Sequence, residues 1–270
     1  MTITVIITTY NAPSYLCRVL YAYSQQTLFP TELIVADDGS TADTGTVIDE
    51  FSRMAPFPIK HVWHEDLGFR VAKIRNEAIK VSQGEYLIFS DGDCIPHRDF
   101  VADHGARAKS GYFVQGTRML VGRLVSDTFS FTSRLNLLGH CLARNISGAH
   151  HLLRIPWFTL EKHGLRGIKT CNFALHRDVA IAVNGFNEAF VGWGREDSEF
   201  VARLFVYGIK RHDLPFSALL FHLWHPANNR DNLAENDRIL VETVVSQTFR
   251  CSCGIVTETI AVENNQETCP

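Results

Sequence analysis

The stretch Ile3-Thr4-Val5-Ile6-Ile7-Thr8-Thr9-Tyr10-Asn11 decides the fold, because it turns from apolar, mostly β-branched residues to polar ones within a single element. Continuous apolar runs of this kind are typical of strands that are buried on both faces of a parallel sheet. The same change recurs where Asp37-Asp38-Gly39-Ser40 and Asp91-Gly92-Asp93 follow apolar runs. We therefore predict strands over residues 3–9, 32–37 and 85–91, each ending in a polar loop.

Helical patterns separate these strands, and they fall at residues 13–26, 42–54 and 71–82, with a further strand at residues 59–64. This βαβ alternation predicts an α/β fold with a mostly parallel, Rossmann-like sheet and helices on both faces. Ligands of such sheets bind at the carboxyl ends of the strands. We therefore expect the three polar loops to line one crevice.

The alternation weakens after about residue 121. Further helices are predicted at residues 127–142, 152–163, 196–207 and 233–247, and further strands at residues 169–176 and 218–222. We expect a single domain over residues 1–250 that contains a helical insertion, followed by a tail over residues 251–270.

The composition excludes general disorder, because the 270 residues are 46% hydrophobic and 20% charged. The apolar runs are far shorter than the roughly 20 residues that a membrane-spanning helix needs. The first residues enter a strand pattern without the features of a secretory signal, so we expect a cytoplasmic protein.

Charge is distributed unevenly, although the formal net charge is only -3. Residues 118–177 hold nine Lys or Arg against two Asp or Glu, a local charge of +7 that leaves -10 for the rest. The basic residues are Arg118, Arg123, Arg134, Arg144, Arg154, Lys162, Arg166, Lys169 and Arg177. Such a block suits an anionic ligand or membrane surface, and the alternative is an ordinary solvated face.

Four sets of residues are able to carry chemistry, and the first three follow the strands of the first half. Two carboxylates around a glycine, as in Asp91-Gly92-Asp93, can hold a divalent cation together with the ribose or phosphates of a nucleotide, although the tripeptide is also a common turn. Of Asp37 and Asp38, one is expected to face a base or ribose, and the other to be structural. Arg75 supplies a cation near the same edge, unless it is a plain surface residue.

The densest group is Gly192-Trp193-Gly194-Arg195-Glu196-Asp197-Ser198-Glu199-Phe200. Acids in a first helical turn are favoured by the helix dipole, so helix capping is one explanation. Capping does not require a tryptophan between two glycines, an arrangement that suits a sugar ring lying on an indole.

Five segments, taken in order, resemble the family-2 inverting glycosyltransferases, which have the GT-A fold. They are Thr8-Thr9-Tyr10-Asn11, Asp37-Asp38-Gly39-Ser40, Arg75-Asn76, Asp91-Gly92-Asp93 and the segment from Gly192 to Asp197. The later segment also resembles a galactosyltransferase-type carboxyl-terminal region. The resemblance covers about residues 3–226. It implies that residues 1–117 form a half that binds the nucleotide sugar, and that residues 118–250 form the acceptor side.

The same resemblance implies a role for individual residues. The donor-binding residues would be Thr9, Tyr10, Asp37, Asp38, Arg75, Asp91, Gly92 and Trp193. Asp93 and His222, with His225 as the alternate, would hold Mn²⁺ or Mg²⁺. Asp197 would be the general base, and Glu196 would take that role if Asp197 does not.

The implied reaction is inverting transfer of a hexose-type sugar from a nucleotide diphosphate sugar, with a UDP-sugar favoured, to a saccharide or glycolipid acceptor. Synthesis of cell-surface polysaccharide or lipopolysaccharide would be its setting, with peripheral contact at the inner face of the cell membrane and no nucleic-acid partner. One alternative is a catalytically silent scaffold that binds nucleotide sugars. Another is a sugar-phosphate nucleotidyltransferase, which the absence of glycine from the loop after the first strand disfavours.

Overall fold

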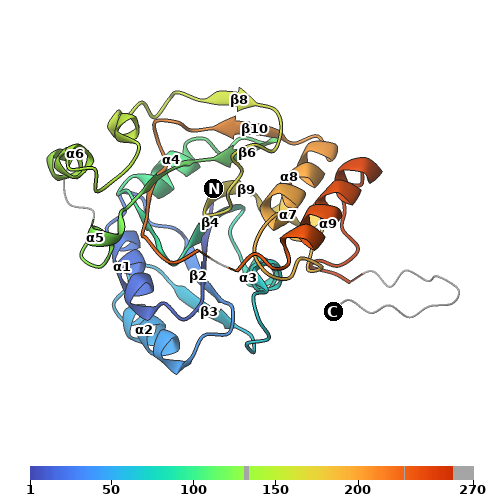
Figure 1. Cartoon of the computed structure of the whole chain (residues 1–270), viewed down its shortest axis with the longest axis horizontal. Coiled ribbons are helices and arrows are strands. Elements are labelled where there is room, and N and C mark those ends of the chain that lie inside the picture. Colours follow the sequence, from blue (N-terminus) through green and yellow to red (C-terminus); the bar gives the residue numbers. More distant parts are fainter. Residues whose placement is uncertain (131–133, 228, 258–270) are drawn as a thin grey trace, which may run out of the picture.

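The computed structural model describes residues 1–130, 134–227 and 229–257. Its first half follows the predicted alternation closely. The elements are β1 (Ile3–Thr9), α1 (Pro13–Tyr23), β2 (Glu32–Asp37), α2 (Ala42–Ser52), β3 (Ile59–Trp63), α3 (Val71–Val81) and β4 (Tyr86–Asp91). Strands β3, β2, β1 and β4 lie side by side and parallel near the centre of the molecule (Figure 1).

Successive residues of the central strands pack against opposite faces of the sheet. In β1, Val5 and Ile7 join an apolar cluster with residues of α1, whereas Ile6 joins a second cluster with residues of α3. In β2, Val35 belongs to the first cluster and Ile34 to the second. Both faces are therefore covered, which is why these strands are apolar along almost their whole length.

The second half extends this sheet and adds helices. Its elements are β5 (Cys94–Pro96), α4 (Phe100–Gly105), β6 (Tyr112–Gln115), β7 (Thr117–Leu120), α5 (Arg123–Ser126), α6 (Arg134–Leu142), a 3₁₀ helix (Ala149–Leu152), β8 (Leu160–Lys162), β9 (Asn172–His176), α7 (Arg177–Ala182), α8 (Glu196–Val206), β10 (Lys210–Asp213), β11 (Leu219–His222) and α9 (Leu233–Ser246). The main sheet has the order β3-β2-β1-β4-β9-β6-β10-β8. Strand β9 is antiparallel to both of its neighbours, and β10 is parallel to β6.

A small second sheet, ordered β5-β11-β7, positions the residues that follow β4. Strand β11 runs antiparallel to β5 and parallel to β7. The register places Cys94 opposite His222. Asp93, which precedes Cys94, is therefore brought next to the end of β11.

The predicted helix over residues 152–163 is wrong. The chain there forms the end of the 3₁₀ helix and then β8, whose Leu160 pairs with Asp213 of β10. Pro156 cannot donate the amide hydrogen bond that a helix interior requires. Of the expected helix over residues 127–142, the structure has only α6, which begins at Arg134; residues 127–130 are not helical, and residues 131–133 lie outside the described part.

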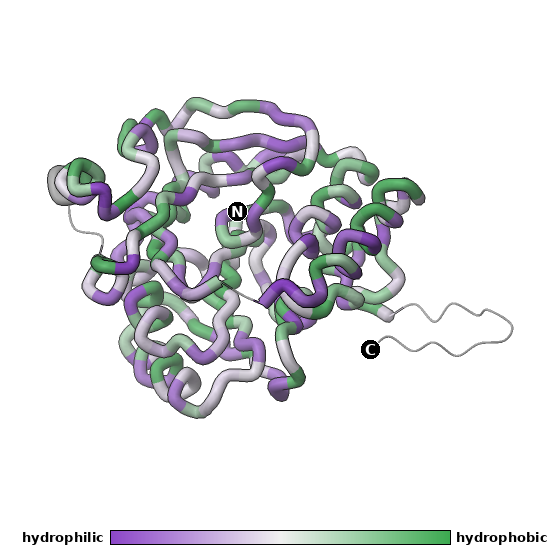
Figure 2. Tube along the Cα trace, in the orientation of Figure 1, coloured by the Kyte–Doolittle hydropathy of each residue, from purple (hydrophilic) through white to green (hydrophobic). Residues whose placement is uncertain are grey.

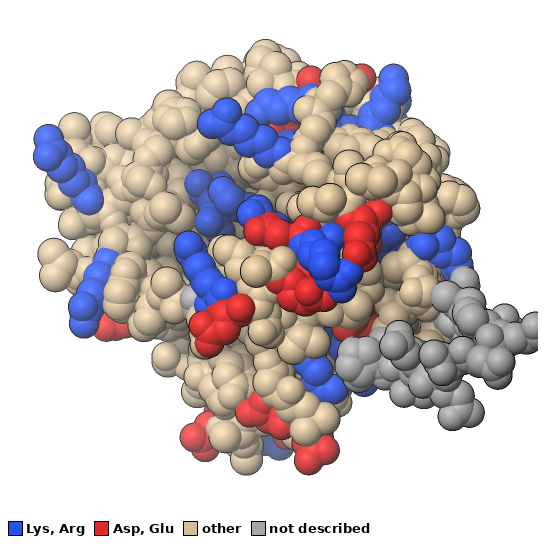
Figure 3. All heavy atoms as spheres, turned by 45° about the vertical axis from the view of Figure 1, so that its right-hand side comes forward, with Lys and Arg blue, Asp and Glu red and all other residues tan. Residues whose placement is uncertain are grey.

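Helices α8 and α9 pack together beside the sheet (Figure 1). Hydrophobic and hydrophilic residues both occur along α9 (Figure 2), and its buried residues are the polar Asn236 and Thr243. On the face in Figure 3, acidic and basic side chains are interleaved. Arg238 of α9 pairs with Glu235, and Asp237 of α9 pairs with Arg195. No helix within the described residues is both long and apolar enough to cross a bilayer.

Candidate active site

Arg75 of α3 links acids from distant parts of the chain. Its side chain is buried, and its guanidinium nitrogens lie 3.5 Å from Asp91 Oδ1, 3.5 Å from Glu196 Oε1 and 3.3 Å from Asp197 Oδ1. The guanidinium also lies 5.2 Å from the centre of the Phe186 ring. The polar loop after β4 and the first turn of α8 therefore meet at one cation, and Arg75 is not a surface residue.

Asp197 also accepts hydrogen bonds from Thr170, which lies in a different part of the chain from Arg75. Thr170 Oγ1 donates to Asp197 Oδ1 over 2.6 Å, and the Thr170 amide donates to Oδ2 over 3.0 Å. Both carboxylate oxygens are thereby oriented. The sequence did not identify Thr170, which lies just before β9 and belongs to none of the recognised motifs.

Glu196 differs from its neighbour because it is buried and has no strong ion pair. Burial and the nearby charge of Asp197 raise the pKa of Glu196 to about 8, although Arg75 acts against this shift. The Glu196 carboxyl is therefore largely protonated at neutral pH. A proton acceptor must be ionised, so a largely protonated Glu196 is poorly suited to that role.

The loop after β4 is packed closely on the end of β1. Thr8 Oγ1 donates to Asp91 Oδ1 over 2.7 Å. A Cβ atom at Gly92 would lie 2.8 Å from Thr9 Oγ1, so only glycine fits here without movement. Among the described residues, the buried Thr9 hydroxyl has no hydrogen-bond partner. The Thr9 hydroxyl is itself buried against Gly92, and a donor-binding role for Thr9 stays a prediction.

Asp93, His222 and His225 form a group that could hold a metal ion. Their ligand atoms all lie within 4.8 Å of one another, with His222 Nε2 3.5 Å and His225 Nε2 3.2 Å from Asp93 Oδ2. Burial opposes ionisation of Asp93, but the hydrogen bond with His225, the charges of His222 and His225 and the hydrogen bond from Cys94 together outweigh it, so the pKa of Asp93 is lowered. Burial lowers the pKa of His222. An ionised carboxylate and a neutral imidazole are the forms that bind divalent metals, so these residues fit such an ion.

Asp37 and Asp38 are both engaged by protein groups. Asp37 accepts a hydrogen bond from the Ser40 amide over 2.8 Å and contacts His61 at 2.9 Å. Asp38 accepts a hydrogen bond from the Arg70 amide over 2.9 Å and contacts His64 at 2.7 Å. The two histidines were not singled out in the sequence. A nucleoside contact by either acid stays a prediction.

Tyr10 and Trp193 lie at the exposed margin of the site. The Tyr10 hydroxyl donates to Asp66 Oδ2 over 2.9 Å. The guanidinium of Arg230 lies 4.9 Å from the centre of the Trp193 ring. One region of the indole surface is thus already covered by a cation, so sugar stacking on Trp193 stays a prediction for the remaining surface.

The basic residues between Arg118 and Arg177 do not make one surface. Arg154 pairs with Asp103, with a nitrogen to oxygen distance of 2.8 Å, and Lys162 pairs with Asp213 at the same distance. Arg177 donates to Ser82 Oγ over 2.9 Å. At least three cations of this block therefore pair with other residues of the fold.

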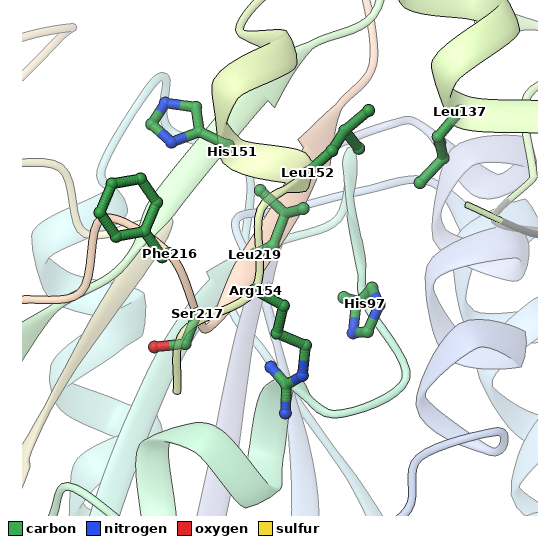
Figure 4. A pocket seen from close by; sticks show the side chains of 8 residues that line it. All are labelled: His97, Leu137, His151, Leu152, Arg154, Phe216, Ser217 and Leu219. Carbon is green, nitrogen blue, oxygen red and sulfur yellow. The ribbon is translucent and has the colours of Figure 1, made fainter. Parts of the chain in front are cut away.

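A separate pocket lies at the other end of the small sheet, away from Asp93. It is lined by His97, Leu137, His151, Leu152, Arg154, Phe216, Ser217 and Leu219, whose side chains Figure 4 shows. The sequence did not single out this pocket. Its cation Arg154 is already neutralised by Asp103.

Fold and site together define an α/β enzyme of the GT-A type. Residues 4–149 match the family described as glycosyl transferase family 2, and residues 158–225 match the one described as the N-terminal domain of galactosyltransferase. The chain therefore belongs to glycosyl transferase family 2.

Curated relatives and solved structures agree with this family. The chain is 30% identical to validoxylamine A glucosyltransferase of Streptomyces hygroscopicus subsp. limoneus, over 77% of this chain and 48% of that protein. It is 24% identical to chondroitin synthase of Escherichia coli, over 91% of this chain and 37% of that protein. The structure of S. aureus TarS 1-349 in complex with UDP-GlcNAc has a TM-score of 0.62 at 16% identity, over 91% of this chain and 67% of that one. The chain spans about half the length, or less, of these two curated relatives.

The raised pKa of Glu196 predicts a dependence of stability on pH. The unfolded chain releases this proton near pH 4.5 and the folded chain near pH 8, so the Glu196 carboxyl lowers stability progressively between these values. The free energy of unfolding of Glu196→Gln, relative to the unaltered chain, should therefore increase from about pH 5 to about pH 8 and then level off. Urea unfolding across this range measures it, with the exposed Glu50→Gln as the control. A difference that does not change with pH would contradict the assignment.

Proposed function

We propose that the chain is an inverting, metal-dependent glycosyltransferase that moves a hexose-type sugar from a nucleotide diphosphate sugar to a saccharide or glycolipid acceptor. A UDP-sugar is the favoured donor, and cell-surface polysaccharide or lipopolysaccharide synthesis is the favoured setting. The TarS structures with UDP and UDP-GlcNAc and the polysaccharide synthases among the relatives support this choice.

The observation that carries the proposal is the shared contact of Asp91 and Asp197 with Arg75. Asp91 belongs to the donor side of the crevice, and Asp197 begins α8 on the other side. A transfer reaction needs a donor and an acceptor hydroxyl at adjacent positions, and holding both in one geometry removes a large entropic barrier. The buried guanidinium holds the two carboxylates near each other, which supports such an arrangement.

The residues of the chain would divide the work as follows. Thr9, Asp91 and Asp37 or Asp38 would bind the nucleoside and ribose, and Asp197 would accept the proton of the attacking hydroxyl. Asp93 and His222, with His225 as the alternate, would hold Mn²⁺ or Mg²⁺, and a bound divalent ion would neutralise the charge that develops on the diphosphate. Thr170 would keep the carboxylate of Asp197 turned toward the acceptor.

Replacing the proposed base separates binding from turnover. Asp197→Asn should retain the affinity for UDP and lower the rate of transfer by roughly 10² to 10⁴, because only the proton acceptor is lost. Calorimetry with UDP and release of nucleoside diphosphate measure the two effects. Asp178→Asn, an exposed acid in the first turn of α7, is the matched control. Normal turnover in Asp197→Asn would move the role to Glu196.

Removal of metal tests the other half of the site. Excess EDTA should abolish transfer and Mn²⁺ should restore it, while Asp93→Ala should lose about a hundredfold or more in turnover. His222→Ala should weaken the Mn²⁺-dependent part of UDP binding, and His163→Ala, at an exposed position, should not. Full activity in EDTA would show that no divalent ion is required.

Peripheral membrane contact is a further part of the proposal. Leu124 of α5, Leu142 of α6 and Trp157 after the 3₁₀ helix are 93%, 77% and 71% exposed, and α5 and α6 lie together at the left of Figure 1. Exposed apolar side chains near arginines suit the surface of an anionic bilayer.

Vesicle sedimentation tests this contact. The chain should bind phosphatidylserine-containing vesicles better than neutral ones, and the difference should diminish as salt screens the attraction. Leu124→Glu with Trp157→Glu should weaken binding, whereas Val245→Glu on α9 should not. Absence of binding to both kinds of vesicle at low salt would favour a soluble acceptor.

A further inference from the structure

Two cations at the centre of the site have no role in the arrangement described above. Arg118 of β7 is half-buried and faces Leu220 of β11, two residues before His222. Its Nη1 atom lies 3.6 Å from Cys171 Sγ, and that sulfur lies within 4.8 Å of a carboxylate oxygen of Asp91. The Arg118 side chain thus extends from the small sheet toward Cys171, which adjoins Asp91.

Lys169 lies near Arg118, because its amide donates to Gln115 Oε1 over 3.1 Å and Arg118 contacts Cys171, two residues after Lys169. It directly precedes Thr170, the residue whose amide and hydroxyl hold Asp197. The surrounding protein atoms and the positive charge of Arg118 both lower the pKa of Lys169. The two cations are therefore close enough to repel each other.

Neither cation has a close ion pair among the described residues, although the charge of Asp91 contributes to the raised pKa of Arg118. Over residues 1–130, 134–227 and 229–257, no carboxylate forms an ion pair with Arg118 or Lys169, and Cys171 is a free thiol. Arg75, by contrast, contacts three carboxylates, and Arg154 and Lys162 each contact at least one. Two adjacent cations without a counter-ion are stabilised when an anion binds between them.

The place of the pair relative to Asp197 indicates which substrate brings that anion. In an inverting displacement the leaving diphosphate lies on the face of the sugar opposite the base. Lys169 adjoins the residue that holds the base, so it lies with the acceptor, and the Asp93 group is available for the diphosphate side. We propose that Arg118 and Lys169 bind an anionic group, a carboxylate or a phosphate, on the acceptor saccharide. This inference rests on the proposed function and adds the class of acceptor to it.

The test measures binding of three small probes in the presence of Mg²⁺ and UDP. Methyl β-D-glucuronide and glucose 6-phosphate are the charged probes, and methyl β-D-glucoside is the neutral one. Titrations followed by ligand-observed NMR should show at least one charged probe binding roughly tenfold more tightly than the glucoside. The charged probe that binds better identifies a carboxylate or a phosphate as the recognised group.

Variants assign the preference to the two cations. Arg118→Gln and Lys169→Gln should each reduce the affinity for the charged probe toward that for the glucoside, and should change the affinity for UDP by no more than about twofold. Arg118→Lys should keep most of the preference, because it keeps the charge. Arg53→Gln, at an exposed position after α2, is the control for net charge, and thermal unfolding verifies that each variant folds.

Two results would overturn the inference while leaving the proposed function intact. Equal affinity of the unaltered chain for charged and neutral probes would show that no anion is recognised. A tenfold loss of UDP affinity in Arg118→Gln would assign the pair to the donor diphosphate instead. Failure of the unaltered chain to bind UDP at all would contradict the proposed function itself.

Discussion

The buried guanidinium of Arg75 is the interaction on which the rest of the site depends. A cation taken out of water is costly unless carboxylates and ordered partners surround it. Arg75 is surrounded by Asp91, Glu196 and Asp197, which come from the end of β4 and the first turn of α8. The end of β4 and the first turn of α8 are therefore joined through the charge of Arg75. Glu196, largely protonated, limits the negative charge gathered around one cation.

The small sheet imposes the second constraint. Strand β5 begins directly after Asp93 and pairs with β11, so the loop after β4 has no freedom to move away from His222. Gly92 allows the loop to pass against Thr9, where a side chain would collide. The positions of Asp93, His222 and the buried Thr9 hydroxyl are consequently set by backbone pairing and close packing, which are more rigid than surface loops.

The sequence predicts the first half of the fold well because its signals are local. Apolar β-branched runs fix β1, β2 and β4, and the polar residues after them identify Asp91 and Asp93. The later part depends on contacts that no local pattern carries. The segment around Leu160 becomes a strand because β10 offers it an edge, and Thr170 matters only because α8 brings Asp197 to it. The sequence predicted that the Trp193 indole is available to a sugar ring, yet the guanidinium of Arg230, 37 residues later in the chain, lies over the indole.

Membership of glycosyl transferase family 2 favours sugar transfer over the two alternatives that the sequence left open, a silent scaffold and a nucleotidyltransferase. The central claim is that this site cleaves a nucleotide diphosphate sugar between the sugar and the diphosphate. Incubating the chain with a panel of nucleotide sugars and Mn²⁺, and identifying the released phosphate species by chromatography, tests it most directly. The account predicts slow release of a nucleoside diphosphate, UDP above all, which a saccharide acceptor accelerates. Release of pyrophosphate, or no cleavage of any donor with or without acceptor, would contradict it.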